Sequence, residues 1–143
     1  MIPLPEDFRD FIQLLNQKRV KYLVVGGYAV AYHGFPRYTG DIDFFVEHSA
    51  RNAALLIEVF RDFGFREPPL AALFLEPGNI VRVGWQPNRL EVINKIDGVS
   101  FDACWKTRIA GLRVNFIDLV HLRQNKLASG RPKDLEDLRQ LPG

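Results

Sequence analysis

The chain of 143 residues contains one cysteine, Cys104, and one methionine. A single cysteine excludes an intrachain disulfide and argues against a zinc site built on thiolates. The chain also lacks a hydrophobic run near the roughly 20 residues that span a bilayer. Its first residues lack the basic and then apolar pattern of a signal peptide. We therefore expect a cytoplasmic protein that does not contact membranes.

An excess of charge of one sign is also missing. Lys and Arg number 19 against 17 Asp and Glu, a formal net charge of +2. This balance is too even to indicate nucleic-acid binding through bulk charge. Hydrophobic residues make up 47% and charged residues 25%, an ordinary globular composition that excludes extensive disorder. The length suits a single domain over residues 1–143.

Hydrophobic periodicity predicts alternating helices and strands in the first half of the chain. Phe8, Phe11, Ile12 and Leu15 form one apolar stripe of a helix. After it we expect a strand over 22–25, a helix over 28–33, a strand over 41–46, and a helix over 50–63 with Ser49 as its N-cap.

The second half is predicted to begin with β-structure and to end in helices. Strands are expected over 80–85 and 89–93, followed by a second hairpin with strands over 106–109 and 112–116. A helix is expected between the caps Asp118 and Gly130, and a last one over 133–141 with Leu135, Leu138 and Leu141 on one side. This order indicates a mixed α/β (α+β) fold, a mixed β-sheet flanked by helices with short C-terminal helices.

Asp41 and Asp43 are the most informative polar residues. Residues i and i+2 of a strand point to the same face, so both carboxylates project together while Ile42 and Phe44 face the core. Two carboxylates this close repel each other unless a cation lies between them, and hard oxygen ligands suit Mg²⁺ or Mn²⁺. Taken alone, the pair also fits two solvated aspartates on an exposed strand.

Gly26 and Gly27 separate the first predicted strand from the helix after it. A glycine pair lets another group approach the backbone closely, and a helix N-terminus offers N–H donors to a phosphate. A tight turn without a ligand gives the same pattern. Together with Asp41 and Asp43, however, the pair indicates a site for a nucleotide and a metal ion.

A third carboxylate would complete such a site. Glu91 lies in the predicted strand 89–93, where Leu90 and Val92 face the opposite side. Asp97 is the alternative, but it precedes Gly98 and favours a turn. We therefore take Glu91 as the third ligand; a charge on an edge strand, or an ion pair with an arginine, is its structural alternative.

The order of these residues resembles the nucleotidyltransferase superfamily of kanamycin nucleotidyltransferase and DNA polymerase beta. The resemblance rests on Gly26-Gly27, a spacer of thirteen residues, Asp41-Ile42-Asp43, and a later acidic strand. His33-Gly34, Arg37, Thr39 and the run over 126–138 are similar to a small prokaryotic branch, which includes abortive-infection-type toxin nucleotidyltransferases.

The resemblance implies transfer of a nucleoside monophosphate from a nucleoside triphosphate (NTP) to an acceptor hydroxyl on an RNA end, a protein or a small molecule. It implies Mg²⁺ or Mn²⁺ as cofactor, with Asp41, Asp43 and Glu91 as metal ligands and catalytic residues. The nucleotide-binding residues that it implies are Gly26, Gly27, Arg37, Thr39, Lys126 and Lys133.

Two departures from the family pattern keep a second function open. Gly27 stands where many members carry Ser, and Glu91 stands where the third carboxylate is usually Asp. Only residues 117–143 follow the predicted sheet, so an acceptor site would be small, shared with a partner protein or a second copy, or absent. The alternative is a catalytically degenerate binding module that acts as an antitoxin or regulatory partner.

Other residues indicate structural roles. We expect Cys104 to be a buried thiol, and Trp85 and Trp105 to lie in the core or at its rim. The alternating charges over 131–139 predict a solvated amphipathic helix.

Overall fold

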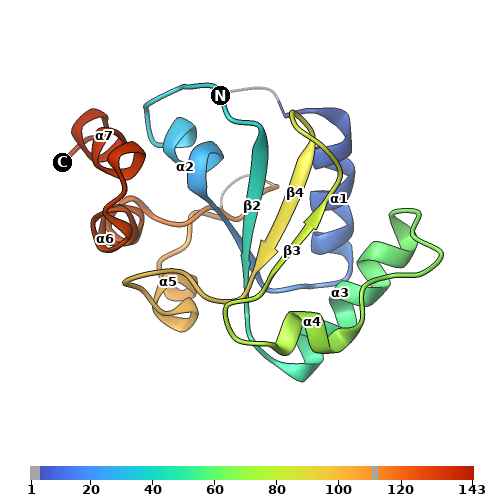
Figure 1. Ribbon diagram of the computed structural model, residues 1–143. Coiled ribbons are helices and arrows are strands. Elements are labelled where there is room, and N and C mark those ends of the chain that lie inside the picture. The colour runs from blue at the N-terminus through green and yellow to red at the C-terminus, as the bar shows by residue number, and fades with distance from the viewer. Residues whose placement is uncertain (1–3, 111–112) are drawn as a thin grey trace.

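The computed structural model describes residues 4–110 and 113–143. At its centre is a four-stranded mixed sheet with the spatial order β1-β2-β4-β3 (Figure 1). The strands are β1 (Tyr22–Val25), β2 (Asp41–Val46), β3 (Ile80–Val83) and β4 (Arg89–Ile93). β2 and β4 run parallel to each other, whereas β1 and β3 run antiparallel to their neighbours.

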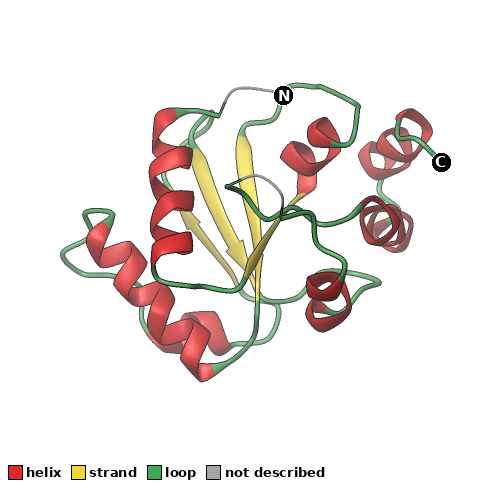
Figure 2. Ribbon diagram, turned by 180° about the vertical axis from the view of Figure 1, so that it is seen from behind, coloured by secondary structure: helices red, strands yellow, loops and turns green. Residues whose placement is uncertain are grey.

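Helices lie on both sides of this sheet. In Figure 1, α1 (Glu6–Gln17), α3 (Ala50–Asp62) and α4 (Ala71–Leu75) lie on one side. On the other side lie α2 (Gly26–Tyr32), α5 (Phe101–Lys106), α6 (Leu119–Ser129) and α7 (Pro132–Gln140). The view from behind shows α1 in front of the strands (Figure 2). The predicted mixed sheet with flanking and C-terminal helices is confirmed.

Strand β2 sends alternate residues to two different layers. Phe44 packs against Phe11 of α1 with ring centroids 5.3 Å apart, and Phe11 meets Phe60 of α3 at 5.2 Å. Phe45 points the other way and meets Phe101 of α5 at 5.2 Å. Because odd and even residues of a strand alternate, the side chain of Asp43 shares the face of Phe45, toward α5, α6 and α7.

The predicted helix ends are confirmed at three positions. Ser49 accepts a hydrogen bond from the backbone N–H of Asn52 at 3.1 Å, and Asp118 accepts one from that of His121 at 3.3 Å. Gly130 ends α6 with φ of +61°, a left-handed conformation that glycine adopts without strain. These local signals hold because each satisfies backbone groups that a helix end leaves unpaired.

The segment after β4 differs from the prediction of a second hairpin. Lys106 ends helix α5, whose first turn is capped by a hydrogen bond from the backbone N–H of Ala103 to Ser100 Oγ at 3.3 Å. Only one antiparallel bridge, between Ile109 and Phe116, joins the two predicted strands within the described residues. The predicted turn Ala110-Gly111 and the start of the predicted second strand at Leu112 fall partly outside the described residues. Ser100 is a preferred N-cap residue and was a local sequence signal for α5.

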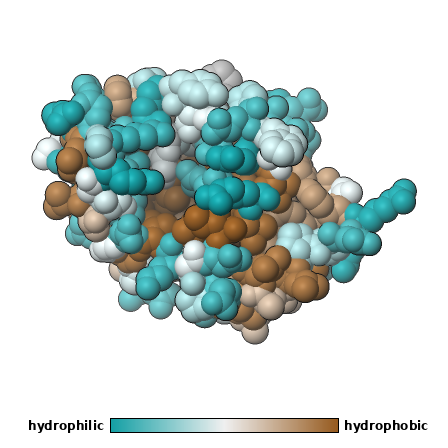
Figure 3. All heavy atoms as spheres, in the orientation of Figure 1, coloured by the Kyte–Doolittle hydropathy of each residue, from teal (hydrophilic) through white to brown (hydrophobic). Residues whose placement is uncertain are grey.

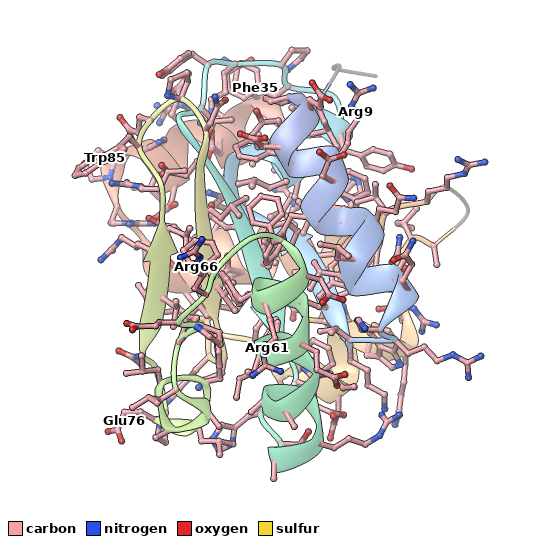
Figure 4. All side chains as sticks on the ribbon, turned by 90° about the vertical axis from the view of Figure 1, so that its right-hand side faces the viewer. Arg9, Phe35, Arg61, Arg66, Glu76 and Trp85 are labelled. Atoms are coloured by element: carbon pink, nitrogen blue, oxygen red, sulfur yellow. The ribbon has the colours of Figure 1, made fainter. Side chains whose placement is uncertain are left out.

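Two further expectations are wrong. Trp85 is 87% exposed beside the β3–β4 turn and points away from the sheet (Figure 4), because β3 ends at Val83. In α7, Asp134 and Asp137 are each 1% exposed, while Leu135 is 40% exposed. The buried side of α7 is therefore partly ionic, for a reason that the ion pairs described below supply.

The single cysteine lies inside the fold. Cys104 is buried, as expected, and burial raises the pKa of its thiol to about 11. Within residues 4–110 and 113–143, none of the helices combines the length and apolar character needed to cross a membrane.

Candidate active site

Strand register places five charged side chains together on one face of the sheet. Asp43 lies opposite Glu91, and Glu91 lies opposite Arg82. Two residues earlier on the two parallel strands, Asp41 lies opposite Arg89. Because positions i and i+2 share a face, these five side chains form one group, which we call the sheet cluster.

The two arginines hold two of the three carboxylates. Arg89 donates from Nε to Oδ1 of Asp41 at 2.8 Å and from Nη2 to Oδ2 at 3.1 Å. The same Nη2 lies 3.4 Å from Oε1 of Glu91, which also accepts from Nε of Arg82 at 2.9 Å. Gln86 adds a hydrogen bond from Nε2 to Oδ1 of Asp41 at 3.3 Å. Asp41 and Glu91 are thus neutralised from within the chain.

Asp43 differs from these two carboxylates. Among the described residues it forms no ion pair. Burial, followed by contact with the carboxyl groups of Glu91 and Asp41, raises the pKa of Asp43 to about 8, and Lys126 opposes this rise only in part. The sheet cluster therefore has three acidic groups against two basic ones, with the uncompensated group at its centre.

The donor chemistry of the sheet cluster fits a hard divalent cation, because carboxylate oxygens are the ligands that Mg²⁺ and Mn²⁺ prefer. Its present arrangement is not yet that of a metal site. In the part of the chain that the structure describes, no three acidic, histidine or cysteine side chains are placed to hold a metal ion together. Both oxygens of Asp41 are engaged by Arg89. The carboxylates of the sheet cluster suit a divalent cation, but one of them, Asp41, is bound by Arg89.

The glycine pair makes room for the chain's own side chains. Gly26 has φ of +66°, and a Cβ at this position would collide with the carboxylate of Asp43. A Cβ at Gly27 would lie 2.7 Å from Oγ1 of Thr39 and 3.1 Å from Nη1 of Arg37. The close approach predicted for this turn therefore occurs, and the groups that approach are Asp43, Thr39 and Arg37.

A second group of charges ties the C-terminal helices to the loop before β2. Lys126 Nζ lies 3.2 Å from Oδ1 of Asp134 and 3.1 Å from Oδ2 of Asp137. Arg37 binds both oxygens of Asp137, each at 2.9 Å, and Arg131 Nε donates to Asp134 at 2.8 Å. We call these five residues the helix cluster.

The lysine and the two aspartates of the helix cluster are more deeply buried than the side chains of the sheet cluster. The side chain of Lys126 is 7% exposed, and those of Asp134 and Asp137 are 1% exposed. Burial alone would raise the pKa of each aspartate, but hydrogen bonds from Arg131 and Lys126 to Asp134, and from Arg37 and Lys126 to Asp137, lower both below their ordinary value. These interactions explain why α7 buries acidic residues instead of only leucines.

A pocket of ≈ 680 Å³ lies between the two clusters, a volume within the range of small-molecule sites. All nine residues predicted for the site line it, namely Gly26, Gly27, Arg37, Thr39, Asp41, Asp43, Glu91, Lys126 and Lys133. Asp97, the alternative third carboxylate, lines it too and accepts from Ser129 Oγ at 3.2 Å.

Ile80, Ile93 and Ile96 give the wall of the pocket an apolar part. In the orientation of Figure 1, hydrophilic surface lies above a hydrophobic area on the face toward the viewer (Figure 3).

An ion pair of Glu91 with an arginine was expected only as an alternative to metal binding, and the structure shows this pair with Arg82. The arginine partner of Asp41 was not predicted. Arg89 and Glu91 are two apart in one strand, a spacing that places both on one face, so this signal was available. Asp134 and Asp137 gave only a charge pattern typical of a solvated helix. Their burial depends on Lys126 and Arg37, which become neighbours only in the folded chain.

Comparison with known proteins identifies the fold. No model of a protein family matches the chain, and no curated protein matches it. A provisionally assigned nucleotidyltransferase from Thermotoga maritima matches in structure with a TM-score of 0.58 and 20% identity, covering 92% of this chain and 88% of that one. The chain has the nucleotidyltransferase fold. ANT(2'')-Ia, solved in complex with adenylyl-2''-tobramycin, matches with a TM-score of 0.56 and 16% identity over 93% of this chain and 84% of its own. Each match spans more than nine-tenths of this chain, so the nucleotidyltransferase likeness includes both the sheet and the C-terminal helices.

Proposed function

We propose that the protein is a metal-dependent nucleotidyltransferase, which moves a nucleoside monophosphate from an NTP to an acceptor hydroxyl. The observation that carries this proposal is the placement of the two clusters. Asp43 and Glu91 lie side by side on parallel strands in a group with more carboxyl than basic side chains, and the helix cluster across the pocket has more basic than acidic side chains. A triphosphate accompanied by a divalent cation is complementary to both.

Asp41, Asp43 and Glu91 would hold Mg²⁺ or Mn²⁺, which when bound supplies positive charge to the transferring phosphoryl group. Lys133 and Thr39, which also line the pocket, would donate to phosphate oxygens. Gly26 and Gly27 allow the loop that carries Thr39 to pack against the backbone. These residues would fix the triphosphate before an acceptor arrives.

The proposed reaction is a displacement at the α-phosphorus of the NTP. The acceptor hydroxyl oxygen forms a bond to the α-phosphorus, and the bond from that phosphorus to the oxygen bridging toward the β-phosphate breaks. Pyrophosphate leaves with the electron pair of this bond. The hydroxyl proton passes to a carboxylate of the sheet cluster, such as that of Glu91, or to solvent.

The acceptor is proposed only as a class. The complex of ANT(2'')-Ia with adenylyl-2''-tobramycin supports an NTP as the donor and makes a small molecule one acceptor to test. An RNA end and a protein hydroxyl are the others. The acceptor site would lie along the apolar part of the pocket or be completed by a partner protein or a second copy.

The test is transfer of label from each of four NTPs labelled in the α-phosphate, with Mg²⁺ or Mn²⁺, to RNA, protein and aminoglycoside acceptors. Asp43→Asn should lower transfer by about 10³-fold, the scale of losing a group that stabilises transition-state charge. Its melting temperature should not fall, because the amide removes a carboxylate that the folded state disfavours.

The matched control is Asp62→Asn, since Asp62 forms an exposed ion pair with Lys18 away from the pocket. This variant should transfer label at the wild-type rate. Transfer that survives in Asp43→Asn would contradict the assignment of the sheet cluster as the active site.

One observation favours the alternative of a degenerate binding module. Arg89 and Arg82 already neutralise Asp41 and Glu91, as expected of a fold kept for binding a partner protein, as an antitoxin or regulator. Such a module would transfer no label to any acceptor, and its partner affinity would be the same in the wild type and in Asp43→Asn.

A further inference from the structure

Arg89 has no part in the reaction proposed above, yet it makes the closest contacts in the sheet cluster. Its guanidinium binds both oxygens of Asp41 and lies 3.4 Å from Oε1 of Glu91. Two of the three proposed metal ligands therefore share one internal cation. The position of this cation follows from strand register, because Arg89 lies directly opposite Asp41 and two residues before Glu91.

A guanidinium and a divalent cation compete for the same oxygen atoms. A bidentate arginine–carboxylate pair occupies one lone pair on each carboxylate oxygen, and Gln86 also donates to Oδ1 of Asp41, so Asp41 offers a metal ion fewer acceptor positions while Arg89 is bound. In addition, a divalent cation next to a retained guanidinium would suffer like-charge repulsion at a separation of a few ångströms. Metal binding therefore requires Arg89 to leave Asp41.

The surroundings of Arg89 allow this movement. Its side chain is 29% exposed, against 1% for the aspartates of the helix cluster. It stands at the first residue of β4, next to the turn that carries the exposed Trp85 (Figure 4). Gln86 in that turn also donates to Asp41, and Arg82 can keep Glu91 partly neutralised. The ion pair can open without disturbing the core.

We propose that Arg89 is a gating counter-ion, which neutralises Asp41 and Glu91 in the metal-free protein and must be displaced before the divalent cation binds. This inference rests on the proposed function, because it takes Asp41, Asp43 and Glu91 as the metal ligands. It assigns to Arg89 a positioning role that sets the metal affinity of the site.

The test is titration calorimetry of the full chain with Mn²⁺ alone, without nucleotide. Arg89→Met, which keeps the length of the side chain and removes its charge, should lower the dissociation constant of Mn²⁺ roughly three- to tenfold, the range of an ion pair that no longer has to be broken. Arg89→Lys keeps the positive charge but loses the two parallel N–H donors of the guanidinium. Its dissociation constant for Mn²⁺ should lie between those of Arg89→Met and the wild type. Arg139→Met removes an arginine paired with Glu136 outside the pocket and should not change the constant.

A second measurement covers the folding of the variant. In EDTA, Arg89→Met should melt below the wild type, because Asp41 has lost its counter-ion beside Asp43 and Glu91. Saturating Mn²⁺ should then raise its melting temperature by more than it raises that of the wild type. Arg89→Gln, which can still donate to Asp41, serves as the replacement should Arg89→Met fail to fold.

The outcomes separate this inference from the proposed function. If Mn²⁺ binds the wild type but not Asp43→Asn, the metal site exists; unchanged or weaker binding in Arg89→Met would then overturn the gating role alone. If Mn²⁺ binds neither the wild type nor Arg89→Met, or binds the wild type and Asp43→Asn equally, the metal site itself fails, and the role of Arg89 fails with it.

Discussion

The sheet cluster and the helix cluster use the same kinds of residues to different ends. The sheet cluster has three carboxylates and two arginines, and its arginines are partly exposed. The helix cluster has two carboxylates and three basic groups, and its aspartates are almost completely buried. The sheet cluster has more carboxyl than basic groups, the helix cluster has more basic than carboxyl groups, and the pocket lies between them.

This difference separates a structural group from a reactive one. In the helix cluster both aspartates are lowered in pKa by several donors, so the folded state favours the charges that it holds. In the sheet cluster the pKa of Asp43 is raised, so the folded state lacks a cation there. A carboxyl group with a strongly raised pKa is typical of functional sites. The ion pairs of the helix cluster, by contrast, fix α6 and α7 to the loop before β2.

The largest loss of stability is expected from breaking the helix cluster at Asp137. Asp137→Asn removes the charge shared by Arg37 and Lys126, and Lys126 is buried. Breaking a buried pair by removing one partner should lower the free energy of unfolding by about 3 kcal/mol. Urea denaturation followed by circular dichroism measures this change. The double variant Lys126→Met/Asp137→Leu should recover at least part of it, and a further loss in the double variant would contradict the pairing.

A smaller effect is expected at the turn that brings the two clusters together. Gly26→Ala places a methyl group at positive φ against Asp43, and we expect a loss of about 2 kcal/mol, partly from the backbone and partly from the collision. Gly130→Ala is the matched control, because Gly130 has φ of +61° and its nearest contact would be 3.6 Å. It should show the backbone part alone, about 1 kcal/mol. Equal losses in the two variants would mean that Asp43 does not press on Gly26.

The smallest effect is expected in acid, where the helix cluster should lose stability as the pH falls. The folded-state pKa values of Asp134 and Asp137 lie below their ordinary value of 3.8. Their stabilising contribution is therefore complete above that value and is lost as the pH falls through the lower folded-state pKa values. Between pH 5 and pH 2, the wild type should lose more stability than Asp137→Asn, as measured by thermal melts. Parallel pH profiles for the two proteins would contradict the assignment.

The sequence was sufficient for the strands that carry the motif, and insufficient where charges decide burial. Tyr22–Val25 and Asp41–Val46 were predicted with their observed bounds, because short apolar runs and the glycine pair are local signals. The last helix was predicted to carry solvated alternating charges, yet Asp134 and Asp137 are buried. Nothing local in the C-terminal sequence indicates that Arg37, a hundred residues away, will neutralise Asp137.

The site shows the same division between local and distant information. Strand spacing placed Asp41 and Asp43 on one face, and the turn signal of Asp97-Gly98 favoured Glu91 over Asp97. The structure places Asp43 directly opposite Glu91. Spacing could not reveal that Arg89 holds Asp41, because this contact depends on the parallel register of β2 and β4. Register joins segments that the sequence separates by more than forty residues.

The most direct test of the account is the thermal stability of the wild type and Asp43→Asn with each NTP, with and without Mg²⁺ or Mn²⁺. A ligand present at 100 times its dissociation constant should add about 2.7 kcal/mol of stability. At least one NTP should stabilise the wild type only when the metal ion is present, and Asp43→Asn should lose this stabilisation. Stabilisation that needs no metal ion, or that is equal in Asp43→Asn, would contradict a nucleotide and metal site between the two clusters.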